Sequence, residues 1–460
     1  MKDIKKIIAL ICISVMTITG IQAQNYKLPE YTKFQMDNGL TVYLMEQHEV
    51  PLISVSAILP AGAIYDGSKS GLAHLTALAL KHGTQNFSKA QIDETLDFIG
   101  ASINVSAYKE YARLSSKFVS KDKDVVLNLV KELLRNPTFN EEEFNKEKSR
   151  TLTELERDKE SPRAVIGDYF DKLLFGNHVY ANSLSGKEAT VEKLTVNDVK
   201  EFYAANYTPD HSAISIIGDF NSNEMKQKIN ALFSDWKKGN STSTDLASQS
   251  IMKPTSTQVL LVNKDDARET TFYIGSPGIS RNNKDLIAIQ VVNTLFGGRF
   301  TSMLNEELRT NSGLTYGARS RFNEFKNGGT FYISTFTAKD NTEKAIDLAL
   351  QVLNRLHTNG IDETLLASAK NYVQGQFPPR YETVGQLSDL LTEMFWYDFD
   401  ETFINDFEKN VDGLTLEKSK DIITKYFPKD VLQFVLIGKA SDIKSIAEKY
   451  GPVNQVEIKD

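Results

Sequence analysis

The chain has 460 residues, a formal net charge of −7 at pH 7, 25% charged residues and 41% hydrophobic residues. The mildly acidic balance favours solubility and argues against nucleic acid as the partner. After the N-terminal segment, no apolar run approaches the length of a bilayer span, so we expect no membrane span in the mature chain.

Residues 1–23 have the pattern of a secretory signal peptide. Lys2, Lys5 and Lys6 form a basic flank, residues 7–18 form a short apolar core, and Ala23 is a small residue suited to cleavage. We therefore expect an exported protein, either periplasmic or secreted. Cys12 is the only cysteine and falls within this segment, so the mature chain has no disulfide and no thiol nucleophile.

Removing a signal peptide with three lysines and one aspartate leaves 437 residues with a net charge of −9. This is too long for one hydrophobic core, so we expect at least two domains. An internal repeat supports two. Three features recur at offsets of 219 or 220 residues, namely Leu-Thr pairs (Leu194, Leu414), turn prolines (Pro209, Pro428) and strand-ending glycines (Gly218, Gly438).

Each copy of the repeat predicts a capped helix, a turn and a buried strand. The predicted fold class is α+β, with two homologous α+β domains at residues 25–236 and 259–455. A linker rich in Ser, Thr and Gly, residues 237–258, joins them.

Local signals place several elements in these domains. Asn38-Gly39 predicts a hairpin turn between two strands, and residues 91–118 predict a helix followed by a strand pair. In the second domain we expect strands at 257–264 and 270–278 and a helix around 286–298.

Residues 71–84, GLAHLTALALKHGT, predict a buried helix that Ser70 caps and Gly83 ends. A zinc site of the H-x-x-E-H type needs two histidines at i and i+4, with a glutamate base before the second. Here His74 takes the first position, but Ala77 stands at the base position and Leu78 at the second histidine. His82 is no substitute, because it lies two turns on and roughly 80° round the helix.

This helix resembles the zinc helix of the pitrilysin/insulinase family of metallopeptidases, and the resemblance covers almost the whole mature chain. Residues 147–163, EKSRTLTELERDKESPR, are similar to the family's helix with the third zinc ligand. That similarity puts Glu154 at the ligand position and Glu147 at a supporting carboxylate. Residues 178–195, HVYANSLSGKEATVEKLT, are similar to the segment that leads to the family's next helix. Residues 295–320, LFGGRFTSMLNEELRTNSGLTYGARS, are similar to its most recognisable C-terminal motif.

A catalytic zinc needs three protein ligands and an open position for water. The resemblance leaves this chain only His74 and Glu154, so it implies that the chain itself holds no zinc and no other cofactor. His74 and Glu154 are then expected to be hydrogen-bonded relics that hold two helices together. Residual zinc binding is the alternative.

The C-terminal motif carries Arg309 and Tyr316. In competent relatives an arginine and a tyrosine at this spacing reach the zinc site from the C-terminal half. The resemblance therefore implies that Arg309 binds the substrate main chain and that Tyr316 stabilises the developing oxyanion. We expect Arg309 near the end of a helix stopped by Gly313, and Tyr316 on the next strand. A charge at a helix C-terminus and an ordinary strand residue are the structural alternatives.

Some enzymes of this family divide the work between two chains. The resemblance implies a subunit without activity of its own that pairs with a zinc-bearing homologue, encloses a chamber and binds peptide substrate. It would supply Arg309 and Tyr316 in trans, and the zinc would belong to the partner. One alternative is a non-enzymatic scaffold or peptide-binding protein of the exported compartment. The other is a different hydrolase with a Ser-x-x-Lys pattern at Ser120–Lys123 or Ser441–Lys444, which arises often by chance.

Overall fold

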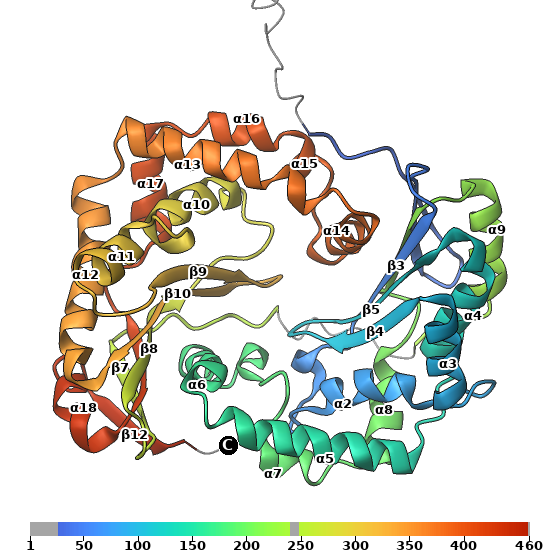
Figure 1. Cartoon of the computed structure of the whole chain (residues 1–460), viewed down its shortest axis with the longest axis horizontal. Helices are drawn as coiled ribbons and strands as arrows, with labels where there is room; N and C mark the ends of the chain where they lie inside the picture. The colour runs from blue at the N-terminus through green and yellow to red at the C-terminus, as the bar shows by residue number, and fades with distance from the viewer. Residues whose placement is uncertain (1–25, 240–247, 459–460) are drawn as a thin grey trace, which may run out of the picture.

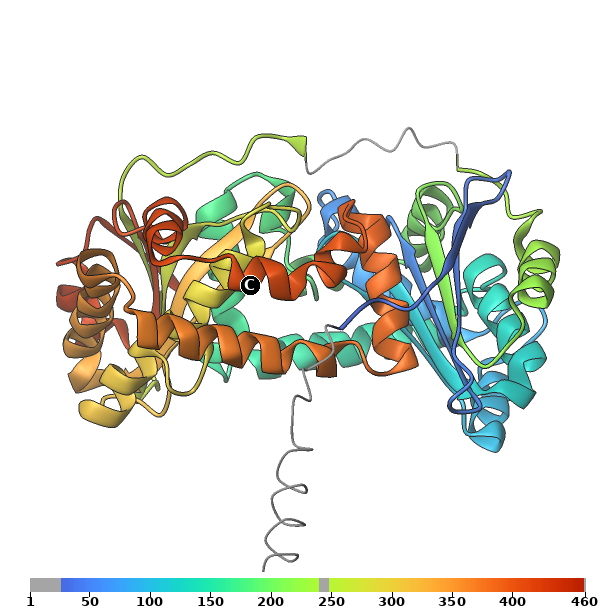
Figure 2. The ribbon, with the colours of Figure 1, turned by 90° about the horizontal axis from the view of Figure 1, so that it is seen from above.

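The computed structural model describes residues 26–239 and 248–458. The predicted signal peptide and Cys12 lie outside these residues, as does the stretch 240–247 within the predicted linker. The two halves of the chain lie side by side, with the second half on the left of Figure 1 and the first on the right. Seen from above, the same two halves are joined along their length by helices that reach from one to the other (Figure 2).

The first half forms a mixed six-stranded sheet in the order β1-β2-β6-β3-β5-β4. Strands β2 and β6 are parallel, and the other neighbours are antiparallel. The predicted hairpin is confirmed, since Gly39 turns the chain between β1 and β2 with a φ of 92° that suits glycine. The strands are β1 Thr32–Gln35, β2 Thr41–Glu46, β3 Leu52–Leu59, β4 Ser102–Ala107, β5 Ala112–Val119 and β6 Ala213–Gly218.

The second half repeats this plan in the order β12-β7-β11-β8-β10-β9. Strand β11 is parallel to β7 and antiparallel to β8, as β6 is to β2 and β3. The prediction of two homologous α+β domains is confirmed. Only the first edge strand differs, because β1 belongs to a hairpin whereas β12 comes from the end of the chain. The strands are β7 Gln258–Asn263, β8 Glu269–Pro277, β9 Arg319–Glu324, β10 Gly329–Ala338, β11 Gln433–Gly438 and β12 Val453–Glu457.

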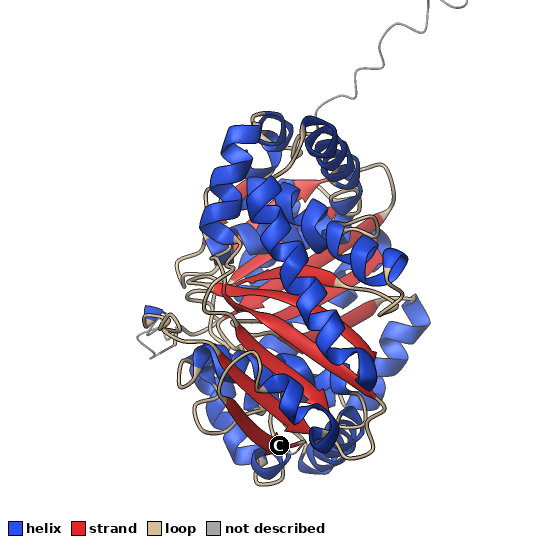
Figure 3. Ribbon diagram, turned by 90° about the vertical axis from the view of Figure 1, so that its left-hand side faces the viewer, coloured by secondary structure: helices blue, strands red, loops and turns tan. Residues whose placement is uncertain are grey.

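Helices cover both faces of the two sheets. From the side of the second half, helices lie across the outer face of its sheet (Figure 3), where α12 and α18 pack on β10 and β7. The helices of the first half are α2 Leu72–Ala79, α3 Lys89–Ile99, α4 Lys123–Arg135, α5 Glu141–Asp158, α6 Pro162–Phe175, α7 Glu188–Val191, α8 Val196–Asn206 and α9 Ser222–Phe233. Those of the second half are α10 Leu286–Asn293, α11 Met303–Asn305, α12 Thr342–Asn359, α13 Glu363–Gln376, α14 Val384–Tyr397, α15 Thr402–Asn405, α16 Phe407–Asp412, α17 Leu416–Tyr426 and α18 Ala440–Ala447.

The two halves exchange one helix each. Helix α6 of the first half packs on β8 and β11 of the second sheet, and α14 of the second half packs on β3 and β6 of the first. Both helices are 14 residues long and occupy equivalent places in the repeat. Phe170 on α6 lies edge-on to Tyr273 and Tyr332, with centroid distances of 5.7 and 5.8 Å. On the other side, Ser215 Oγ of β6 donates a 2.7 Å hydrogen bond to the Ser388 carbonyl of α14.

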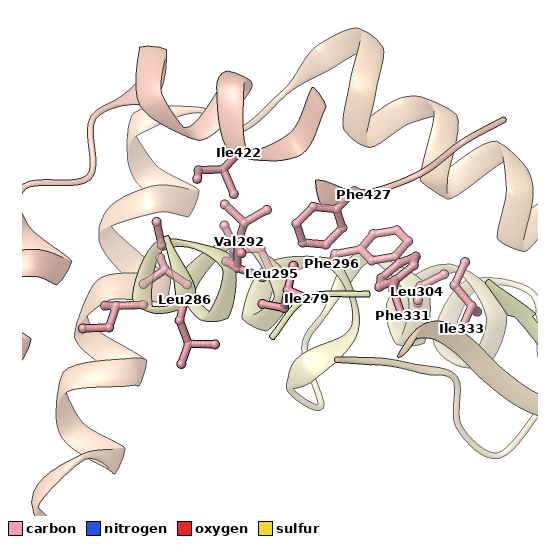
Figure 4. Close-up of a cluster of buried hydrophobic side chains, with 14 of the residues drawn as sticks. Ile279, Leu286, Val292, Leu295, Phe296, Leu304, Phe331, Ile333, Ile422 and Phe427 are labelled. Carbon is pink, nitrogen blue, oxygen red and sulfur yellow. The ribbon is translucent and has the colours of Figure 1, made fainter. Parts of the chain in front are cut away.

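This exchange merges the hydrophobic interior of the two halves. Val292, Phe296, Phe331 and Phe427 form the centre of a buried cluster in the second half (Figure 4). The same cluster continues through the apolar face of α14 to Ile217 of the first sheet. No helix among the described residues is long and apolar enough to cross a bilayer.

Candidate functional site

The helix that carries His74 is shorter than the stretch predicted at residues 71–84. α2 runs from Leu72 to Ala79 and continues into a 3-10 turn at Leu80–His82, which ends at Gly83 as predicted. The predicted Ser70 cap is wrong. Gly71 is the N-cap residue, with a φ of 94°, and the buried Ser70 hydroxyl has no hydrogen-bond partner among the described residues.

Asp66 caps α2 in place of Ser70. Its Oδ2 accepts a 2.8 Å hydrogen bond from the Gly71 backbone nitrogen, and its Oδ1 accepts one of 2.7 Å from Ala73. These bonds satisfy donors that have no partner within the helix. Burial nevertheless raises the pKa of Asp66 to about 7, because the cost of removing the carboxylate from water exceeds the benefit of the backbone donors.

His74 and Leu78 lie one helical turn apart, on the one part of α2 that is not fully buried, whereas Ala77 is completely buried. Helix α5, which carries Glu147 and Glu154, packs along α2. Burial lowers the pKa of His74, and the nearby carboxylates of Glu154 and Glu147 offset part of this effect. The structure therefore brings His74, Glu147 and Glu154 into one neighbourhood, as the sequence suggested.

The predicted hydrogen bond between His74 and Glu154 is absent from the described structure. Glu154 is exposed and acts on His74 only through its charge. Glu147 instead lies beside the buried His82, with Oε2 3.7 Å from Nε2. The sequence did not predict this contact between Glu147 and His82, because His82 lacks the spacing of a zinc ligand.

These residues do not fit a catalytic zinc. The side chain of Leu78 offers no donor atom beside His74, and Ala77 offers no base. Within residues 26–239 and 248–458, no group of three or more His, Cys, Asp or Glu side chains is placed to hold a metal ion. What remains of the pattern is one half-buried imidazole that feels the charge of two carboxylates on the neighbouring helix α5.

Arg309 and Tyr316 lie in the second half of the chain, between α11 and β9. In Figure 1 the labels α11 and β9 stand to the left of α2, which belongs to the first half. Arg309 belongs to a π-helical turn, Glu306–Asn311, that continues α11, and Gly313 follows it with a φ of 65°. The guanidinium of Arg309 lies over the ring of Phe300, with Cζ 4.7 Å from the centroid, and Phe300 is itself 67% exposed.

Tyr316 is not on a strand, which corrects the prediction, because β9 begins only at Arg319. It lies in the preceding loop and is 82% exposed. Neighbouring hydrogen bonds fix that loop. The Thr335 hydroxyl donates to the Gly317 carbonyl at 2.9 Å, and the Asn305 side chain accepts from the Ala318 nitrogen at 3.2 Å.

The glycine pair Gly297-Gly298 belongs to the same motif as Arg309 and Tyr316 and lies in a tightly packed turn. Residues Thr294–Gly298 form a second π-helical turn, which packs against β9. A Cβ on Gly297 would lie 2.3 Å from the Ser320 backbone nitrogen, so only glycine allows this approach. π-helical turns are uncommon and are found frequently at functional sites.

Tyr316 borders a hollow of about 390 Å³ that sequence reasoning missed. Arg309 is not among its lining residues, which are Arg163, Thr271, Tyr273, Tyr316, Gly317, Arg319, Ser334, Thr335 and Phe336. Arg163 comes from the exchanged helix α6. No sequence signal links Arg163 to the residues of the second half that line the hollow. Arg319 falls within the C-terminal motif at residues 295–320, but nothing in the sequence indicated a role for it.

The two Ser-x-x-Lys patterns form no nucleophile with a lysine base. Ser120 Oγ donates to Asp219 Oδ2 at 3.0 Å, and Ser441 Oγ donates to Asp442 Oδ1 at 3.3 Å. Both hydroxyls are thus engaged with carboxylates.

Comparison with known proteins gives one consistent result. The profile of the insulinase family (peptidase family M16) matches residues 41–188, and that of the peptidase M16 inactive domain matches residues 193–373. A Bacillus subtilis protein described as "Uncharacterized zinc protease YmxG" is 22% identical over 344 residues, 75% of this chain and 82% of its own. A Helicobacter pylori protein described as "Non-peptidase homolog YmxG" is 24% identical over 441 residues, 93% of this chain and 98% of its own.

The fold is shared with a crystal structure described as the peptidase M16 inactive domain from Pseudomonas fluorescens. The two superpose with a TM-score of 0.84 at 24% identity, over 89% of this chain and 98% of the other. The two profiles match in tandem, the first within the first half and the second from α8 of the first half to α13 of the second. The chain therefore belongs to the insulinase family, peptidase family M16, as a member without that family's complete zinc-binding set.

Proposed function

We propose that this chain is the catalytically incomplete subunit of an insulinase-like peptidase, and that it pairs with a zinc-bearing homologue to cleave peptides. One observation carries this proposal. Arg309 and Tyr316 both reach the surface, and within the described residues neither side chain has an ion pair or a hydrogen bond. Neither side chain is therefore committed to a polar partner within the chain, and both are available for a ligand.

Their chemistry suits a supporting role at a reacting peptide bond. The guanidinium of Arg309 offers a charged, planar set of donors to a main-chain carbonyl. The phenol of Tyr316 can donate to an oxygen on which negative charge develops. Zinc, in the partner, would activate the water and polarise the carbonyl. This chain's part is to bind and orient the peptide.

The test is a native pull-down of the tagged mature protein, followed by a peptide-cleavage assay with and without a zinc chelator. We expect a homologue carrying H-x-x-E-H in the pull-down, and cleavage that the chelator abolishes. Arg309→Ala and Tyr316→Phe should each lower kcat/KM of the complex by roughly 10²–10³ without dissociating it. Arg268→Ala, at an exposed arginine in the turn before β8, is the control and should retain activity. Dissociation of the Arg309→Ala complex, or unchanged turnover, would contradict the proposal.

A second candidate is a non-enzymatic scaffold or peptide-binding protein. The alignment over nearly the full length of both chains with a relative described as a non-peptidase homolog favours it. In that case the pull-down contains no zinc-bearing homologue, and the cleavage assay shows no activity that a zinc chelator abolishes.

Export is part of the proposal in both cases, and the basic and apolar pattern of residues 1–23 supports it. Mass spectrometry of the mature protein should find an N-terminus at Gln24 in the periplasmic or secreted fraction. A cytoplasmic protein that retains Met1 would refute export.

A further inference from the structure

The hollow beside Tyr316 lies at the seam between the two halves. Arg163, in the first turn of α6, comes from the first half, whereas Arg319 at the start of β9 and Phe336 on β10 come from the second. The exchange of α6 is what places the two guanidinium groups around one space of about 390 Å³.

The two arginines are held differently. The guanidinium of Arg163 lies on the ring of Phe336, with Cζ 3.6 Å from the centroid, so the ring fixes the plane of the charged group. Within residues 26–239 and 248–458, Arg163 has one ion pair, a 3.7 Å contact with Glu269. Both side chains are largely exposed, so this pair is weak. Arg319 is exposed and has no ion pair in the described part of the chain.

Among the described residues, those that line the hollow include no carboxylate, and Glu269 lies outside the lining. The remaining lining offers hydroxyl groups and aromatic rings, including Ser334 on β10 and the exposed ring of Tyr316. Two guanidinium groups with free donors and no acid between them form a space that favours an anion.

We propose that this hollow is a subsite for a carboxylate of the peptide substrate, bound between Arg163 and Arg319. This inference rests on the proposed function and adds a substrate class to it, namely peptides with an acidic group near the residue that Tyr316 contacts. The fork geometry of two arginines matches a planar carboxylate. An extended peptide advances about 3.3 Å per residue, so a side chain one or two residues from that contact can reach the hollow.

The carboxylate could belong to an aspartate or glutamate side chain or to a peptide C-terminus, and the experiment separates these sources. Fluorescence anisotropy would measure binding of three labelled peptides of otherwise identical sequence to the purified mature chain. The first has an internal Glu and an amidated C-terminus, the second has Gln in place of Glu, and the third combines Gln with a free C-terminal carboxylate. The assay needs no partner subunit and no cleavage.

We expect the wild-type chain to bind at least one carboxylate peptide about tenfold more tightly than the neutral peptide. Arg163→Gln and Arg319→Gln should each reduce this ratio to near one. Arg321→Gln is the matched control, because Arg321 is an exposed arginine on the same strand that does not line the hollow, and it should preserve the ratio. If Arg163→Gln fails to fold by circular dichroism, Arg319→Gln alone decides the outcome, since β9 is an edge strand.

If the wild-type chain binds all three peptides with equal affinity, the carboxylate subsite is wrong. Peptide binding would still be observed in that case, so the proposed function would stand. A preference for carboxylate that survives both substitutions would also overturn the subsite. If none of the peptides binds, the proposed function and the subsite both fail. Arg309→Ala separates the two ideas further. Arg309 is proposed to bind the peptide main chain and does not line the hollow, so this variant should weaken all three peptides alike and leave the ratio unchanged.

Discussion

Asp66 Oδ1 accepts a 2.7 Å hydrogen bond from the backbone nitrogen of Ala73, within the first turn of the helix that lost its zinc pattern. The serine next to this turn leaves its hydroxyl unpaired. A buried carboxylate from the preceding loop therefore fixes the start of α2.

This contact predicts a specific pH dependence. Burial raises the pKa of Asp66 to about 7 in the folded chain, above its ordinary value of 3.8. Its contribution to stability is therefore complete below pH 4 and is lost as the pH rises to about 7, by at most about 4 kcal/mol. We expect Asp66→Asn to remove this dependence, so the difference in unfolding free energy between wild type and variant should shrink or change sign across this range. Urea unfolding at several pH values measures it.

Asp97→Asn, at an exposed aspartate on α3, is the control and should follow the wild-type pH profile. Parallel profiles for wild type and Asp66→Asn would show that Asp66 is ionised throughout the range.

The position of His74 predicts that a zinc site can be rebuilt. Leu78→His should complete three ligands with His74 and Glu154, and bind one zinc per chain by elemental analysis. Ala77→Glu together with Leu78→His should add the base. Zinc should then raise the melting temperature, because a ligand that binds only the folded state stabilises it. Ala77→Glu alone should bind none. If Leu78→His also binds none, Glu154 is not at the ligand position.

The ion pairs of Arg113 should contribute to the free energy of unfolding, because they link α14 to the first sheet. It lies on β5 and pairs with Glu393 at 3.2 Å and Asp389 at 3.6 Å, both on α14. Arg113→Met should destabilise the chain by about 2–4 kcal/mol, because it leaves two partly buried carboxylates without their cation. Lys146→Met removes two exposed ion pairs within α5, with Glu142 and Glu143, and should cost less than about 1 kcal/mol in the same urea titration. Equal effects would show that the link between the halves contributes nothing.

The two glycines beside the Arg309 segment should respond differently to alanine. Gly297→Ala places a Cβ against the backbone of β9 and should destabilise by more than about 2 kcal/mol. Gly313 has open space around it, so Gly313→Ala meets only the left-handed backbone and should cost about 1 kcal/mol. Thermal unfolding of the two variants compares them, and the reverse order would contradict the close approach of Gly297 to Ser320.

Sequence reasoning reached the duplicated fold because β6 and β11 carry the same buried pattern at the same place in each copy. The sequence could not predict that α6 and α14 each pack on the sheet of the other half. The apolar face of α6, with Ile166 and Phe170, reads the same whichever sheet it covers. Arg163 was missed for that reason, because its neighbours come from the other half.

The other differences between the predictions and the structure have local geometric causes. The capping of α2 depends on a carboxylate four residues before Ser70, which no cap pattern includes. Tyr316 lies in a loop because the left-handed turn at Gly313 leaves several residues before β9 begins. The absence of a bond between His74 and Glu154 follows from Glu154 lying on an exposed part of α5, and the spacing along the helix could not reveal that.

The exchanged helices also bear on whether one repeat could fold alone. Each repeat gives its helix to the sheet of the other, so a single repeat would leave the face of its own sheet bare and carry a helix with nothing to cover. We therefore expect that one repeat on its own would fold only as a symmetric pair of identical chains, each lending the other a helix. Because both copies stand in one polypeptide here, each can hold different residues, and His74 belongs to the first copy whereas Arg309 and Tyr316 belong to the second.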